Sequence, residues 1–79
     1  GMVIRVEGQE PLLQGGTVTV AAYVGNAIRH VMVGLDPEPY RLALQAHADW
    51  QPVHCVGELV KTGRAYELKN PRLFRVVEE

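Results

Sequence analysis

The sequence contains no serine, which excludes every enzyme class that relies on a serine nucleophile. Threonine is the alternative hydroxyl, but Thr17 and Thr19 stand in a run of β-branched residues that favours a strand on packing grounds alone. The single cysteine, Cys55, directly follows His54. Neighbouring residues of a strand point to opposite faces, so these two cannot form a catalytic pair, and we interpret Cys55 as a small core residue.

Motifs that hold metal ions or phosphate groups are also missing. The three histidines lie in separate segments and match no spacing that is typical of a metal site. The pair Gly15-Gly16 lacks both the Lys-Ser/Thr ending and the following helix of a phosphate loop. We therefore expect no metal, no cofactor and no enzymatic activity of the chain's own. The enzymatic alternative is a contribution of His47, His54 and Glu58 to an active site shared with another subunit.

Long apolar runs and an excess of charge of one sign are missing as well. No segment approaches the roughly 18 apolar residues that a membrane span requires, and the N-terminus lacks the basic and apolar regions of a signal peptide. A lone cysteine argues against a small secreted domain, which usually carries several disulfides. We therefore expect a cytoplasmic protein with no membrane partner. The net charge of −1 provides no overall field that would attract nucleic acid.

The chain does have enough apolar residues for one small core. Hydrophobic residues make up 47% of its 79 residues and are spread along the whole length, which argues against a disordered chain. Gly1 before Met2 resembles the remnant of a cleaved tag. We therefore expect a single domain over residues 2–79, in a chain whose native sequence begins at Met2.

Alternating apolar and polar residues predict a protein built mainly of short strands. The expected strands cover residues 2–7, 17–24, 27–35, 53–60 and 65–69, with 73–77 as a last strand or a bent continuation. In the first strand, Met2, Ile4 and Val6 are expected to share one face. Gly25-Asn26 predicts a hairpin turn, because both residues tolerate positive φ. Gly34 predicts a bulge or a close approach of another backbone segment.

One helix is predicted between the third and fourth strands. Asp36 can cap its start, and the prolines and Glu38 that follow suit a first helical turn. The helix is expected to end near Asp49, since the residue before Pro52 avoids the helical conformation. The residues expected to face the core share one side at helical spacing: Tyr40, Ala43, Leu44 and His47.

The resulting order is β-β-β-α-β-β, which leaves two architectures open. Either the strands curl into a small barrel with the helix at one end, or they form an open α+β sheet that the helix covers. The order resembles the OB-fold, in which a helix lies between the third and fourth of five strands. The C-terminal stretch VHCVGELVKTGRAYELKNPRLFRVV is similar to a strand-turn-strand ending common in that fold and in uncharacterised bacterial proteins. The resemblance implies that residues 8–16 and 61–64 form loops beside a binding face.

Basic residues are concentrated near the C-terminus. Residues 61–75 contain five of the eight basic residues and one acid, with aromatic residues among them. This combination is typical of single-strand nucleic-acid binders, which pair a positive groove with aromatic side chains that stack on bases. The residues of this predicted site are Lys61, Arg64, Tyr66, Lys69, Arg72 and Arg75. The alternative is that the cations protect an edge strand and that Tyr66 and Phe74 belong to the core.

A second hypothesis concerns association with other proteins. Leu12 and Leu13 are two apolar residues in a loop rich in glycine and glutamine, where they can contact a partner or fold over the mouth of the barrel. Small domains often cover exposed apolar surface by pairing with a second copy. We therefore expect a non-enzymatic interaction module that binds a protein partner or forms a homodimer. The alternative function is single-stranded nucleic-acid binding through residues 61–75.

Overall fold

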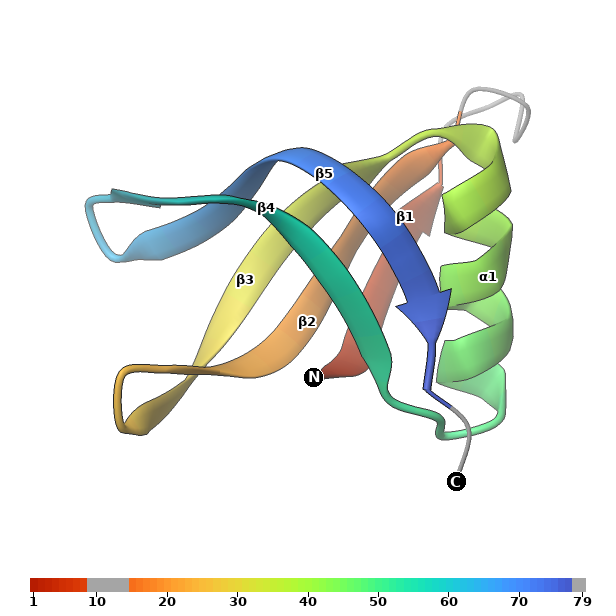
Figure 1. Cartoon of the computed structure of the whole chain (residues 1–79), viewed down its shortest axis with the longest axis horizontal. Coiled ribbons are helices and arrows are strands. Elements are labelled where there is room, and N and C mark those ends of the chain that lie inside the picture. Colours follow the sequence, from red (N-terminus) through yellow and green to blue (C-terminus); the bar gives the residue numbers. More distant parts are fainter. Residues whose placement is uncertain (9–14, 78–79) are drawn as a thin grey trace.

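The computed structural model describes residues 1–8 and 15–77, which contain five strands and one helix (Figure 1). The elements are β1 (Met2–Gly8), β2 (Gly16–Val24), β3 (Ala27–Leu35), α1 (Pro37–Ala48), β4 (Val53–Thr62) and β5 (Ala65–Val76). The predicted class, a mainly β fold with one helix after the third strand, is confirmed. The segments predicted at 65–69 and 73–77 belong to the single strand β5.

The strands form one sheet in the order β1-β2-β3-β5-β4. Its neighbours are antiparallel except β3 and β5, which run parallel. The outer strands β1 and β4 approach each other at their first residues, where Met2 forms a bridge with Pro52. At the same place the Val53 amide donates to the Gly1 oxygen at 2.7 Å, and the N-terminal ammonium group of Gly1 donates to the Val53 oxygen at 2.9 Å. The sheet is therefore curled, but it is not closed into a barrel by pairing along these two strands.

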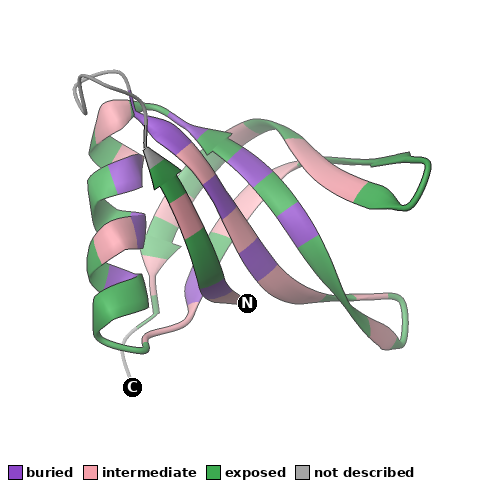
Figure 2. Ribbon diagram, turned by 180° about the vertical axis from the view of Figure 1, so that it is seen from behind, coloured by how far each residue is buried: buried purple, intermediate pink, exposed green. Residues whose placement is uncertain are grey.

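The core lies between the inner face of the curled sheet and the helix. The helix stands at one end of the sheet, and the two hairpin turns point away from it (Figure 1). Buried and less buried residues alternate along most of β2 and β3, as expected for strands with one face on a core (Figure 2). The buried residues are Val3, Val18, Val20, Val31, Val33, Leu35, Tyr40, Ala43, Ala46 and Val53. Most are valine or alanine, so the core is built of small side chains.

The helix begins and ends close to the predicted residues, but its predicted core face is partly wrong. Tyr40 and Ala43 are buried as expected and Leu44 packs against the core, whereas His47 is exposed. Ala46 is buried where His47 was predicted to be, because the buried residues of α1 are three apart: Tyr40, Ala43 and Ala46. The next residue along the helix is rotated by about 100° and faces solvent.

The predicted face of β1 is also wrong in part. The pairing of β1 with β2 shifts register between Val3 and Arg5, which marks a bulge at Ile4. Val3 is therefore buried, whereas Ile4 is 43% exposed. After the bulge Val6 packs against the core again. Ile4 is the extra residue of this bulge, and its side chain therefore does not lie on the core face that was predicted for it.

The two glycine predictions for the β2–β3 hairpin have different outcomes. The hairpin is confirmed, since Val24 pairs with Ala27 across the turn and Gly25 has a φ of 68°. Gly34 forms neither a bulge nor a close backbone contact. The β2–β3 register is regular at this residue, and no atom lies within 4 Å of the place that a Cβ would occupy.

Candidate functional site

Three of the predicted basic residues lie in one row on β5. Lys69, Arg72 and Arg75 pair with Glu58, Val56 and His54 of β4. Since these partners are alternate residues of β4, they share one face, and the three cations share it with them. A spacing of three residues would alternate between faces in a regular strand.

Two bulges in β5 produce this alignment. The register shifts twice between β4 and β5, and in each case β5 contains one more residue than β4. Asn70 and Leu73 lie in the two longer stretches of β5 and have φ values of 51° and 55°. Both residues are in the left-handed region, which non-glycine residues rarely occupy. The extra residues keep the basic row on the outer face of the sheet.

The other three predicted residues lie elsewhere on the same hairpin. Lys61 and Tyr66 are direct partners on the inner face, and the Lys61 Nζ atom is 5.7 Å from the centre of the Tyr66 ring. Arg64 is exposed in the turn, beside Gly63 with its φ of 62°. The structure thus divides the predicted site into an outer basic row and a group at the hairpin tip. The aromatic residue of the predicted site is not on the face of the basic row.

Acidic side chains reduce the charge of the basic row. The Nζ atom of Lys69 is 3.0 Å from Oε1 of Glu67, and both side chains are exposed to solvent, so this ion pair contributes at most about 1 kcal/mol. Asn70 donates a 3.5 Å hydrogen bond from Nδ2 to Oε2 of Glu58. Arg72 donates from Nη1 to the backbone oxygen of Asn70 at 3.5 Å. Within the described residues Arg72 forms no ion pair and can contact an anionic ligand.

Cys55 is half-buried, and its thiol is held by backbone carbonyl groups. Its Sγ atom donates to the oxygen of Arg72 at 3.4 Å and to that of Val56 at 3.7 Å. Burial raises the pKa of the Cys55 thiol above its usual value, although contacts with these backbone groups and the charge of Arg72 act in the opposite direction. The thiol is therefore neutral near neutral pH, which disfavours a nucleophilic role.

Histidines and carboxylates do not converge in the described part of the chain. His30, His47 and His54 are all exposed and come from three different elements. Among residues 1–8 and 15–77, no group of three or more His, Cys, Asp or Glu side chains is arranged to hold a metal ion.

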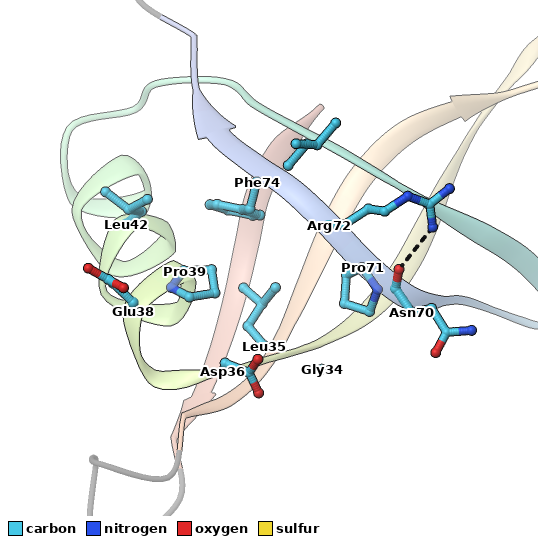
Figure 3. Close-up of a pocket in the computed structure, with 11 residues that line it drawn as sticks. Gly34, Leu35, Asp36, Glu38, Pro39, Leu42, Asn70, Pro71, Arg72 and Phe74 are labelled. Atoms are coloured by element: carbon cyan, nitrogen blue, oxygen red, sulfur yellow. Dashed lines mark hydrogen bonds between the residues drawn. The ribbon is translucent and has the colours of Figure 1, made fainter.

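The described surface includes two hollows that could hold a ligand. The larger, of about 540 Å³, lies between the start of α1 and the bulged part of β5 (Figure 3). Phe74 points toward the helix and Arg72 points away from it, while Asp36 and Glu38 lie at the opposite wall (Figure 3). Gly34 borders this groove, and its missing side chain leaves room there. The groove combines apolar walls with charges of both signs and defines no single class of ligand.

The smaller hollow, of about 220 Å³, lies against the inner faces of both hairpins. Its walls include Val20, Ala22, Val31, Leu59 and Leu68. No acidic, lysine or arginine side chain belongs to its lining. Small side chains on the strands leave this space, which continues the core toward the hairpin tips.

An apolar patch on the outer face of β2 and β3 was not predicted as a site. We define this outer patch as the residues Tyr23, Ile28 and Met32, which are 76%, 59% and 47% exposed. Tyr23 pairs directly with Ile28, and Met32 follows on the same face of β3. The signal was present in the sequence, because the alternation that buries the valines of β2 and β3 places Tyr23, Ile28 and Met32 on the opposite face.

The other predicted interaction residues, Leu12 and Leu13, lie outside the described residues.

No protein-family model, curated protein or solved structure matches the chain. Among the described residues, no helix combines the length and the apolar character that crossing a membrane requires.

Proposed function

We propose that the chain is a non-enzymatic interaction module that binds a second copy of itself through the outer patch. The observation that carries this proposal is the exposure of Tyr23, Ile28 and Met32 on one face of two paired strands. A tyrosine beside aliphatic side chains is typical of the centre of a protein interface. A cytoplasmic location belongs to the same proposal and is supported by the lone cysteine.

The lack of charged residues among the patch side chains supports a second copy of the chain as the partner that covers this face. The outer-face residues between the patch side chains are Thr19, Ala21 and His30, so no lysine, arginine or carboxylate lies among them. Charged residues are depleted at the centre of protein interfaces, since burying them is costly. Two copies of this surface can therefore meet without bringing like charges together at its centre.

The test is the mass of the protein in solution, measured by sedimentation velocity over a wide range of concentration. We expect a dimer at high concentration for the wild type and a monomer for the double variant Tyr23→Thr/Ile28→Thr, which keeps β-branched residues in the strands. The matched control is Trp50→Asn, which replaces a residue that is 83% exposed on another part of the surface. This control should remain dimeric. A wild type that stays monomeric at every concentration would contradict the proposal.

A second candidate function is single-stranded nucleic-acid binding, which we also propose because of the basic row. Lys69, Arg72 and Arg75 are exposed along one face of β5 and can contact successive phosphates. The likeness to the OB-fold belongs to this proposal, and five strands with a helix after the third support it. Tyr66, on the inner face, would have to contribute base stacking from the hairpin tip.

The nucleic-acid proposal predicts a definite salt dependence. Three phosphate contacts give a slope of about −2 for log affinity against log salt concentration, since each contact on a single strand contributes about −0.7. Arg72→Glu/Arg75→Glu should lower the affinity and bring the slope to about −0.7. Fluorescence anisotropy with labelled single-stranded DNA and RNA measures both quantities. The control Arg29→Glu/Arg41→Glu makes the same change in net charge elsewhere, and an equal loss of affinity in this control would contradict a role for the basic row.

A further inference from the structure

The inner faces of the two hairpins are only partly covered by the rest of the domain. Leu59 of β4 pairs with Leu68 of β5, and both residues line the smaller hollow. Leu68 also pairs with the buried Val33 of β3, so these leucines lie on the core side of the sheet. Leu59 is nevertheless 48% exposed. Apolar surface on the concave side of the sheet is therefore open to solvent at this hollow.

Two cations lie on the same inner faces, next to residues that line the hollow. Arg29 of β3 is the direct partner of Ala22, which belongs to the lining. Lys61 follows Leu59 on the same face of β4, and its Nζ atom lies over the Tyr66 ring. Direct partners in an antiparallel pair share a face, so both cations extend from the inner side of the sheet. Both are exposed, one on each hairpin.

No carboxylate accompanies these cations on the inner faces of the hairpins. The cross-strand pairs there are Ala22–Arg29, Val24–Ala27, Leu59–Leu68 and Lys61–Tyr66. Glu58 and Glu67 lie on the outer face, because each is next in sequence to an inner-face residue. Within the described residues, neither Arg29 nor Lys61 forms an ion pair. The inner side of the hairpins thus combines an apolar hollow with positive charge that no acid in this part of the chain neutralises.

The curl of the sheet brings the inner side chains together. β1 meets β4 at the bridge between Met2 and Pro52, so the inner face is concave and its side chains converge. One strand, β5, separates β3 from β4, which places the strands that carry Arg29 and Lys61 about 10 Å apart. The long side chains of arginine and lysine can both reach an anion between them.

We propose that the inner hollow binds a single-chain aliphatic anion, whose carboxylate contacts Arg29 and Lys61 and whose hydrocarbon chain enters the hollow. The volume of about 220 Å³ is below the range of about 300–1,000 Å³ that is typical of pockets for drug-sized molecules, which favours one slender chain. The apolar lining matches a hydrocarbon, and the two cations favour negative charge at its end. This inference goes beyond the proposed self-association, because it concerns the opposite face of the sheet.

Titration of the isotope-labelled protein with octanoate, below its critical micelle concentration, tests the site. We expect saturable changes of the methyl signals of Val24, Leu59 and Leu68 in NMR spectra, while the methyl signal of Met32 on the outer face stays constant. Each buried methylene group contributes about fourfold to affinity, so hexanoate should bind about 15-fold more weakly. Octyltrimethylammonium has the same chain with the opposite charge and should bind about tenfold more weakly than octanoate.

Two variants separate the apolar part of the site from its charged part. Ala22→Leu fills the hollow and should lower the affinity for octanoate at least about tenfold in a folded protein. Arg29→Gln/Lys61→Gln should lower the affinity for octanoate about tenfold but leave the affinity for octanol unchanged. The matched control Arg41→Gln/Arg75→Gln makes the same change in net charge on other surfaces and should bind octanoate like the wild type. Circular dichroism checks that each variant is folded.

Several results would overturn this inference. Octanoate that causes no saturable change would do so, as would equal binding of octyltrimethylammonium or an equal loss of affinity in the control variant. Unchanged octanoate affinity in a folded Ala22→Leu protein would show that the chain does not enter the hollow. Binding to vesicles of anionic phospholipid without binding to monomeric octanoate would favour a membrane surface instead. None of these readouts depends on the oligomeric mass that tests self-association, so the two proposals fail independently.

Discussion

At the scale of single residues, small side chains on the inner faces of the hairpins limit how completely the domain is packed. Ala22 and several valines line a hollow of about 220 Å³ that continues the core. Protein interiors are normally filled to the density of organic crystals, so unfilled space means lost dispersion contacts. A larger side chain at the edge of this hollow should therefore stabilise the fold.

The variant Ala22→Leu tests this expectation. Its added carbons enter the hollow, whose lining contains no lysine, arginine or carboxylate, and the free energy of unfolding should rise by about 1 kcal/mol. Urea denaturation measures this change. Ala65→Leu makes the same substitution at an exposed position beside the second hairpin turn and should change the free energy by less than about 0.5 kcal/mol. Destabilisation by Ala22→Leu would show that the inner faces close on themselves in solution.

The sequence pattern identified most residues of the candidate site, but it did not indicate on which face of the sheet each one lies. The composition of residues 61–75 identified the basic residues, but it could not show that Lys61 and Arg72 lie on opposite faces of the hairpin. The bulges that set these faces depend on Asn70 and Leu73 adopting left-handed conformations. Leucine rarely does so, and therefore no local signal in the sequence indicates it.

At the scale of the elements, regular alternation made most of the strands predictable. The long β-branched runs of β2 and β3 alternate without interruption, and the hairpin between them contains a glycine that can take positive φ. The prediction failed where a strand contains an extra residue, as at Ile4 of β1 and at the two bulges of β5. A bulge is stabilised by pairing with the neighbouring strand, so its position is set by tertiary contacts and not by local sequence.

Two glycines in strands should respond in opposite ways to the same substitution. A Cβ at Gly57 of β4 would lie 2.7 Å from the backbone oxygen of Lys69 and 2.8 Å from Cγ of Leu68. Gly57→Ala should therefore force β4 away from β5 and lower the free energy of unfolding by about 1–3 kcal/mol.

Gly34→Ala is the matched control for this prediction. No atom lies within 4 Å of its added Cβ, and the loss of flexibility in the unfolded chain should raise stability by about 0.5 kcal/mol. Thermal and urea denaturation of both variants measure the difference. Equal effects at the two positions would show that β4 and β5 do not approach as closely as the structure shows.

At the scale of the whole molecule, an open curled sheet leaves one face on the core and the other toward solvent. The outer face carries the outer patch on β2 and β3. The net charge of −1 produces little repulsion between copies of the chain. We infer that association with a second copy covers this face, while the inner face and the helix stabilise the fold.

The most direct test of the account is a dilution series of the uniformly labelled wild-type protein, followed by amide chemical shifts in NMR spectra. Self-association through the outer patch predicts shifts that depend on concentration at Tyr23, Ile28 and Met32. The amides of Leu42 and Gln45, on the exposed side of α1, should stay constant in the same series. Spectra that do not change with concentration, or changes confined to α1, would contradict the account.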